Sequence, residues 1–184
     1  SISRTLEAAL EWKDEQGNPA DFLLTIDYDS FFQPSQVRDL AVIMAQHPEI
    51  DALVPMQMKR TVSQLLTQTN GAVNLLEPLV PILAGHFGLT MFRRDALLKL
   101  ERPWFRETPN AEGKWGEGRI DSDIGYWNNF KACGLNAMLA TKVVIGHGEH
   151  VISFPRVNDG KIEKVYQTLE DWLKGAPEGV GVIG

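Results

Sequence analysis

Two carboxylates spaced by one residue follow an apolar run near the start of the chain. The run 23–26 (Leu-Leu-Thr-Ile) is typical of a buried strand, and Asp27, Tyr28 and Asp29 come directly after it. Because side chains alternate along a strand, Asp27 and Asp29 point the same way if the extended geometry persists. Like charges this close repel, so either one carboxyl group is protonated or a cation lies between them. The pair predicts a cation site, although Asp-X-Asp is about as common in turns and caps.

Three further polar side chains are expected at the same edge of the fold. His147 follows a predicted strand, and Asp121 and Asp123 open a predicted helix. The carboxyl ends of parallel strands form the ligand crevice of an open α/β sheet, so these groups are expected to meet Asp27 and Asp29. Carboxylates suit Mg²⁺ or Mn²⁺, and an imidazole favours Mn²⁺. The simpler alternatives are a surface histidine between two glycines and ordinary helix-capping acids.

The elements that must position these groups alternate along the chain. Helical spacing or capping residues predict helices over 3–13, 34–47, 95–100 and 121–133, and another after Pro155 that carries Val165, Leu169, Trp172 and Leu173. Apolar runs predict strands over 22–26, 52–56, 89–92, 137–140 and 143–145. This order predicts an α/β fold, an open and mostly parallel sheet flanked by helices. Residues 1–174 form one domain in this interpretation, and 175–184 form a flexible, glycine-rich tail.

The stretch 102–119 is a long loop that contains Trp104 and Trp115. Long loops in compact domains are usually functional or disordered, and large apolar rings favour function. We therefore expect this loop to be functional. Large aromatic rings also anchor loops by hydrophobic contact.

Composition restricts the classes of function and the cellular setting. A net charge of −6 and a pI near 5.2 argue against a nucleic-acid or anionic-membrane binder, which needs a basic surface. The single cysteine, Cys133, cannot form an internal disulfide. With no apolar run of about 18 residues, no membrane span is expected, and we predict a cytoplasmic protein.

The order of the motifs resembles the glycosyltransferases of the GT-A fold over roughly residues 3–150. In that family an apolar strand ends in Asp-X-Asp, here 27–29, which holds a divalent metal against the diphosphate of a nucleotide-sugar. The segment 85–94 (Gly-His-Phe-Gly-Leu-Thr-Met-Phe-Arg-Arg) resembles the segment that lines the donor-sugar pocket. An acidic pair that opens a helix closed by Gly134, and then a strand pair that ends in Gly-His, follow in the family's order.

The resemblance implies a ligand for each part of the site. Mn²⁺ or Mg²⁺ would be held by Asp27, Asp29 and His147, with Asp27 on the metal or on the donor's ribose. The residues expected to bind the donor are Asp27, His86, Gly88 and Trp104. The resemblance also implies that the loop 102–119 is a lid that closes over the donor, in which Trp104 or Trp115 would stack on the sugar or anchor the loop.

The residues expected to act on the acceptor differ slightly from the family's sequence pattern. Asp123 is the expected base that receives the acceptor's hydroxyl proton. Many members have Glu-Asp where this chain has Ser122-Asp123, so Asp121 would substitute for the missing glutamate. The implied reaction moves a sugar from a nucleoside-diphosphate sugar to an acceptor hydroxyl. The sugar, the acceptor, the stereochemical course and the oligomeric state stay open.

The N-terminal part of the chain differs more strongly from the family's pattern. GT-A enzymes begin with a strand, a helix and a strand that hold the nucleotide base, whereas this sequence starts in the helix before the Asp-X-Asp strand. We therefore expect a fold truncated at its N-terminus, with the nucleotide site completed by a preceding segment or a partner chain.

Two alternatives belong to other functional classes. The chain would be a non-catalytic GT-A remnant that binds a sugar or a metal. A phosphatase of the haloacid-dehalogenase type also has a strand that ends in Asp-X-Asp, with the first aspartate as nucleophile. That family expects Thr or Val two residues after the second aspartate, where this chain has Phe31.

Overall fold

The structure is a computed structural model that describes residues 2–60, 63–72, 74–149, 151–158 and 161–175. Its elements, in chain order, are α1 (Ile2–Glu11), β1 (Phe22–Leu24), β2 (Ser30–Phe31), α2 (Pro34–Gln46), β3 (Ala52–Met56), β4 (Leu79–Pro81), β5 (Met91–Arg93), α3 (Arg94–Lys99), α4 (Ser122–Ala132), β6 (Ala137–Val144), β7 (Gly146–His147), β8 (Val151–Asn158), β9 (Lys161–Thr168) and α5 (Leu169–Lys174).

The main sheet is mixed rather than mostly parallel. Its five strands lie in the order β1-β5-β3-β6-β4, and β3 with β6 is the parallel pair, whereas β1–β5, β3–β5 and β4–β6 are antiparallel. The α/β class is confirmed, and the mostly parallel sheet was a wrong prediction. Parallel neighbours need a crossover of a dozen or more residues, usually a helix. The described residues between β3 and β5 contain no helix that would carry the chain across.

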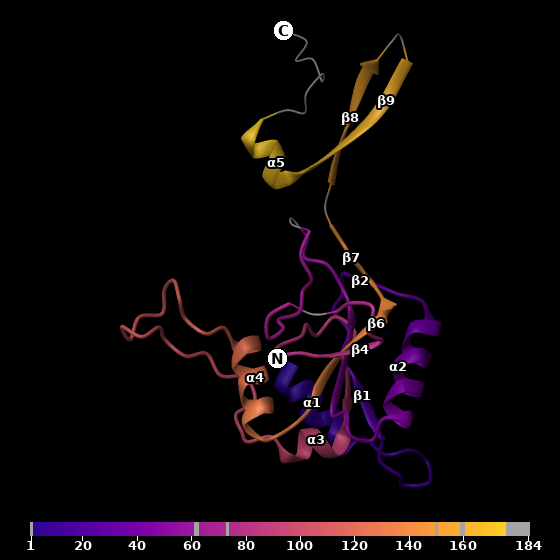
Figure 1. Ribbon diagram of the computed structural model, residues 1–184, viewed down its shortest axis with the longest axis vertical. Coiled ribbons are helices and arrows are strands. Elements are labelled where there is room, and N and C mark those ends of the chain that lie inside the picture. Colours follow the sequence, from indigo (N-terminus) through magenta and orange to yellow (C-terminus); the bar gives the residue numbers. More distant parts are fainter. Residues whose placement is uncertain (1, 61–62, 73, 150, 159–160, 176–184) are drawn as a thin grey trace.

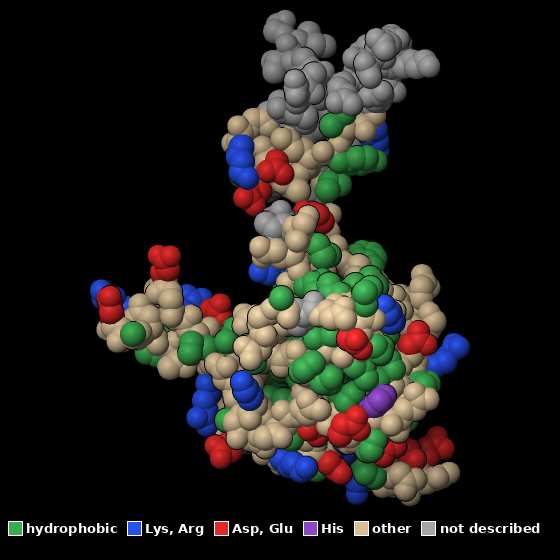
Figure 2. Space-filling view, in the orientation of Figure 1, with side chains coloured by type: hydrophobic (Ala, Val, Ile, Leu, Met, Phe, Trp, Pro, Cys, Tyr) green, Lys and Arg blue, Asp and Glu red, His purple; other side chains and the backbone are tan. Residues whose placement is uncertain are grey.

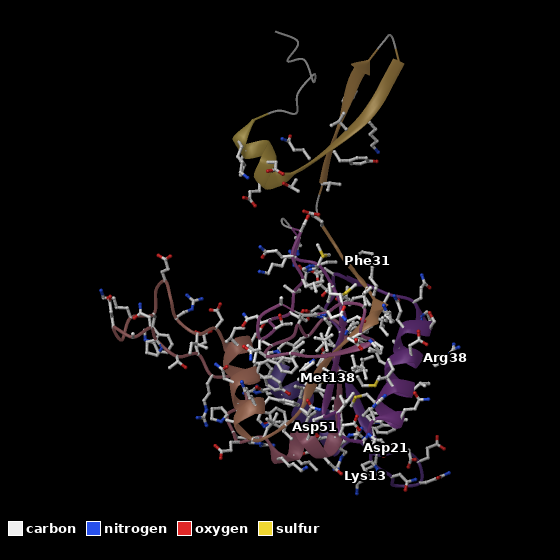
Figure 3. All side chains as sticks on the ribbon, viewed as in Figure 1. Lys13, Asp21, Phe31, Arg38, Asp51 and Met138 are labelled. Atoms are coloured by element: carbon white, nitrogen blue, oxygen red, sulfur yellow. The ribbon has the colours of Figure 1, made fainter. Side chains whose placement is uncertain are left out.

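Three strands nevertheless run in the same direction. Because β1 and β3 are both antiparallel to β5, they share a direction, and β6 is parallel to β3. Figure 3 shows Asp21 and Asp51, the residues just before β1 and β3, toward one end of the body and Phe31 at the other. The carboxyl ends of β1, β3 and β6 therefore lie at one edge of the sheet, which is the edge where the predicted site residues follow.

Helices cover both faces of this sheet. Leu40 and Met44 of α2 pack with Leu53 of β3 in one buried cluster. Val54 of β3 belongs to a second cluster with residues of α1, α3 and α4, including Trp127. Figure 1 shows α2 on one side of the strands and α3 and α4 on the other. Because both faces of β3 are buried, its sequence is apolar throughout instead of alternating.

The C-terminal elements stand apart from this body. The hairpin of β8 and β9 and the short helix α5 project away from the sheet in Figure 1. The helix predicted after Pro155 was wrong, because 161–168 is a strand that pairs antiparallel with β8 and only Leu169–Lys174 is helical. Asp159-Gly160 is a turn signal typical of a two-residue hairpin, and β-branched residues on both sides favour strands. Most of the predicted tail, 176–184, lies outside the described residues.

Candidate functional site

The chain stays paired beyond the end of β1 and so positions the two acids. The N–H groups of Thr25 and Asp27 donate to the carbonyls of Thr90 and Gly88 at 2.9 and 3.1 Å. A turn follows, in which the N–H of Ser30 donates to the carbonyl of Asp27 at 3.1 Å. Asp27 and Asp29 therefore flank Tyr28 where the strand becomes a turn, and not within a regular strand.

A second, smaller pairing brings His147 to Asp29. β2 pairs antiparallel with β7, so that Ser30 lies opposite His147. The N–H of Gly148 also donates to the carbonyl of Asp29 at 2.6 Å. Two segments more than a hundred residues apart in sequence thus place an imidazole next to a carboxylate.

The predicted polar residues line one cavity of about 590 Å³. Six of the eight residues proposed from the sequence are in its lining: Asp27, Asp29, His86, Asp121, Asp123 and His147. The common direction of β1 and β6 explains why Asp27 and Asp29 meet His147, because the segments after these strands lie at the same edge of the sheet. Their binding of a metal, a donor or an acceptor stays a prediction.

His147 is oriented by a backbone carbonyl. Its Nδ1 lies 2.9 Å from the carbonyl oxygen of Met58, which only accepts, so Nδ1 carries the proton and donates. Nε2 is then left with its lone pair and lies 3.5 Å from Oδ2 of Asp29. Histidines that bind metals are usually fixed in this way, with the other ring nitrogen donating to a carbonyl or carboxylate.

Arg60 completes this corner of the cavity, and the sequence did not single it out. Its Nη2 donates to Oδ2 of Asp29 at 2.5 Å, and its Nε donates to Nε2 of His147 at 3.0 Å. The side chain of Asp29 is 13% exposed and that of Arg60 is 46% exposed. No spacing in the sequence of this segment reveals that Arg60 reaches Asp29.

The acids of the cavity are electrostatically coupled. Partial burial raises the pKa of Asp27, and the charges of Asp29 and Asp123 raise it further. Partial burial likewise raises the pKa of Asp123, with a smaller contribution from Asp121, while the hydroxyl of Ser122 opposes the shift. Each raised pKa favours the protonated, neutral form of the carboxyl group.

The two acids at the start of α4 differ in their surroundings. Both acids are exposed. Asp121 precedes the helix, and Nε of Arg119 donates to its Oδ1 at 3.0 Å. Asp123 lies in the first turn, within hydrogen-bond reach of the Ser122 hydroxyl at 3.5 Å. Because Asp121 already has a cationic partner, Asp123 is the better candidate for a base.

His86 and Gly88 have structural roles next to the site. The buried ring of His86 donates from Nε2 to the carbonyl of Pro55 at 3.0 Å, and its Nδ1 accepts from the N–H of Gly88 at 3.0 Å. Burial lowers the pKa of His86 to about 4. A Cβ at Gly88 would lie 2.6 Å from Oγ of Ser30, so only glycine fits. Gly88 is not in the lining of the cavity, and the ring nitrogens of His86 are already occupied by backbone groups.

Trp104 does not fit the predicted role in donor binding. Its side chain is 3% exposed in the core, and its Nε1 donates to the carbonyl of Leu100 at 3.3 Å. The sequence shows that a tryptophan is present in the loop, but not that the ring turns inward. Trp115 is 60% exposed. The loop 102–119 projects sideways from the body in Figure 1, and none of its residues lines the cavity in this conformation.

An apolar groove of about 580 Å³ lies beside the acidic cavity, between α1 and β1. Ala9, Trp12, Phe22 and Leu24 contribute to its walls, and Asp27 lines both the groove and the cavity. Figure 2 shows a patch of hydrophobic side chains on the viewed face of the body. β1 is an end strand of the sheet, and no further strand pairs with its outer edge among the described residues.

No group of three or more His, Cys, Asp or Glu side chains is arranged to hold a metal ion within the described part of the chain. Asp29 and His147 offer two donor atoms, which suits a cation that takes its other ligands from substrate and water. Over the same residues, no helix is long and apolar enough to cross a bilayer.

Comparison with known proteins adds a structural likeness. No family model matches the sequence, and no curated protein matches it either. The fold is similar to the solved structure titled "Crystal Structure of A197 from STIV", with a TM-score of 0.53 and 16% sequence identity. The match covers 91% of this chain and 74% of that one. At this identity the likeness concerns the fold alone.

Proposed function

We propose that this protein is a metal-dependent glycosyltransferase of the GT-A type, which moves a sugar from a nucleoside-diphosphate sugar to an acceptor hydroxyl. The observation that carries the proposal is the meeting of Asp29, His147 and Asp123 in one cavity. The common direction of β1, β3 and β6 supports it, because Asp-X-Asp and Gly-His then follow strands at one edge.

Asp29 and His147 are the residues that would hold Mn²⁺ or Mg²⁺. Neighbouring ligands of an octahedral ion with bonds of about 2.1 Å are about 3 Å apart, and Oδ2 of Asp29 and Nε2 of His147 are 3.5 Å apart. The bound ion would stabilise the negative charge that develops on the departing diphosphate. Arg60 lies against both donor atoms and must give way.

Asp27 and Asp123 would act on opposite ends of the donor. Asp27 lies where the acidic cavity meets the apolar groove, so a nucleoside attached to a diphosphate at Asp29 would extend along α1 and β1. Asp123 would receive the proton of the attacking hydroxyl, and its raised pKa makes it a stronger base than an ordinary aspartate.

Hydrolysis and transfer with a panel of nucleotide-sugars, with and without Mn²⁺, test this proposal. We expect Mn²⁺-dependent turnover, and a decrease in kcat of about 100-fold or more for Asp123→Asn with donor binding retained. Asp95→Asn is the matched control, because Asp95 is the exposed first-turn acid of α3, outside the cavity. Equal activity of the two variants would contradict the assignment of the base.

A second candidate is a non-catalytic protein that binds a metal or a sugar. The open outer edge of β1 favours it, since the described residues include no strand that would complete a nucleotide pocket there. Metal binding with no turnover of any nucleotide-sugar would support this alternative. Release of phosphate from a phosphomonoester that depends on Asp27 would instead indicate the phosphatase chemistry.

A further inference from the structure

The Arg60 guanidinium lies against the two atoms that the proposed function assigns to a metal. Nη2 contacts Oδ2 of Asp29 at 2.5 Å, and Nε contacts Nε2 of His147 at 3.0 Å. These acceptors are 3.5 Å apart. A guanidinium cannot lose its proton in a protein, so it is a permanent cation at this position.

A divalent ion and Arg60 therefore compete for this position. Nε2 of the neutral His147 has a single lone pair, which cannot both accept from Arg60 and bind an ion, and at Oδ2 of Asp29 the two cations would repel each other. Since the tautomer of His147 is set by the carbonyl of Met58, the ring does not need to turn when the partner of Nε2 changes. The exchange requires only that the arginine side chain move.

The Arg60 side chain is exposed enough to move, and a bound diphosphate would offer it new hydrogen-bond acceptors nearby. The side chain of Arg60 is 46% exposed, whereas that of Asp29 is 13% exposed, so the guanidinium enters from the rim of the cavity. Lys59, beside it, also lines the cavity and gives that rim a second positive charge. The open positions of an ion held by Asp29 and His147 would be filled by phosphate oxygens, which a guanidinium binds with two parallel hydrogen bonds.

We infer that Arg60 exchanges partners during donor binding: it neutralises Asp29 in the metal-free protein and becomes a diphosphate ligand once a divalent ion has taken Asp29 and His147. This inference rests on the proposed function and adds to it a residue that makes metal and donor binding mutually dependent. It predicts opposite effects of one substitution on two ligands, and these effects should be much larger than those of removing the same charge from Lys59, which does not contact Asp29.

Calorimetric titration of the full chain with Mn²⁺ alone, and with a nucleoside diphosphate at saturating Mn²⁺, tests the inference. In Arg60→Gln we expect Mn²⁺ alone to bind roughly tenfold more tightly, because the competing guanidinium is gone, and the nucleoside diphosphate to bind roughly tenfold more weakly. Lys59→Gln is the matched control, because it removes the same charge from the same rim. Lys59 bonds to Gln64 at 3.2 Å instead of to Asp29, so each of its affinities should change about twofold or less.

Three results would overturn the inference in distinguishable ways. Unchanged or weaker Mn²⁺ binding in Arg60→Gln would show that Arg60 does not compete with the ion. Unchanged diphosphate affinity would show that Arg60 is not a phosphate ligand. If Mn²⁺ binds neither the wild type nor Arg60→Gln at millimolar concentration, the metal-dependent function itself fails, and this inference fails with it.

Discussion

His86 is a buried histidine held in its neutral form by two backbone groups. One ring nitrogen donates to the carbonyl of Pro55 and the other accepts from the N–H of Gly88, so protonation would place a second donor against that N–H. Burial lowers the pKa of His86 to about 4, from an ordinary value of 6.5. The ring therefore supports the turn before β5 only while it is uncharged.

The free energy of unfolding should depend on pH because of His86. Above pH 6.5 its contribution is fully present. Between pH 6.5 and about 4 the unfolded chain binds a proton that the folded chain does not, and up to about 3 kcal/mol of stability is lost. Asp27 and Asp123 act with the opposite sign, since their raised pKa values favour the folded state as they become protonated.

Urea unfolding at several values between pH 7 and pH 4 measures this dependence. His86→Gln should flatten the loss of stability between pH 6.5 and 4, because the titrating ring is gone. His47→Gln is the control, since His47 lies at the surface and pairs with Glu49 at 2.9 Å. If the slope is unchanged in His86→Gln, His86 is not the group responsible.

At the scale of single residues, the sequence predicted the acids of the cavity better than the residues that contact them. Asp29 and His147 were found because Asp-X-Asp and Gly-His follow apolar runs, and polar side chains at the ends of buried strands are well placed to meet a ligand. Arg60 was missed because its contact with Asp29 depends on the path of an irregular segment, not on any period. Trp104 was misassigned because an aromatic ring in a loop packs inward or stacks on a ligand equally well.

The backbone of α4 packs closely against the loop before it at a glycine. A Cβ at Gly125 would lie 1.9 Å from the carbonyl oxygen of Arg106, so the helix and the base of the loop touch backbone to backbone. Farther out, the N–H groups of Thr108 and Ile120 donate to each other's carbonyls at 3.0 and 2.9 Å. The base of the predicted lid is thus held beside Asp123, independently of the conformation of the loop tip.

Gly125→Ala should separate the loop from α4. Alanine is the better helix former by about 1 kcal/mol, but the clash with Arg106 requires a backbone shift, and we expect a net loss of about 1–3 kcal/mol in the free energy of unfolding. Gly116→Ala is the matched control in the loop, because a Cβ there meets nothing within 4 Å. Urea unfolding and limited proteolysis of the loop compare the two. Equal stability would contradict the close contact.

Element types were predictable where a pattern was long and capped. The helices α2 and α4 and the strand β3 were predicted to within a few residues, because proline, aspartate or an apolar run marks their bounds. The predicted helix was right for Leu169 and Trp172, which lie in α5, but it wrongly included Val165 of β9, because the three residues together fit a helical spacing. The separation of α5 from β9 depends on the hairpin with β8, a long-range pairing that a helical window does not detect.

At the scale of the whole molecule, the site exists only because distant segments end at one edge. Asp29 follows β1, Arg60 follows β3, His147 follows β6, and Asp123 opens the helix between β5 and β6. The direction of the strands was predicted correctly for these three, although the strand β4 and the antiparallel direction of β5, which was predicted as a strand over 89–92, were not foreseen. A sequence shows where strands end. The order of the strands in the sheet depends on which strand edges pair with each other, and packing decides this pairing.

The most direct test of the central claim is a crystal structure of the protein soaked with Mn²⁺ and a nucleoside diphosphate, with the ion located by its anomalous signal. The account predicts one Mn²⁺ within about 2.5 Å of both Oδ2 of Asp29 and Nε2 of His147. Diphosphate oxygens should fill open positions of the ion, and the Arg60 guanidinium should have left Asp29. A Mn²⁺ ion bound elsewhere, or a diphosphate bound away from Asp29 with Arg60 still in place, would contradict it.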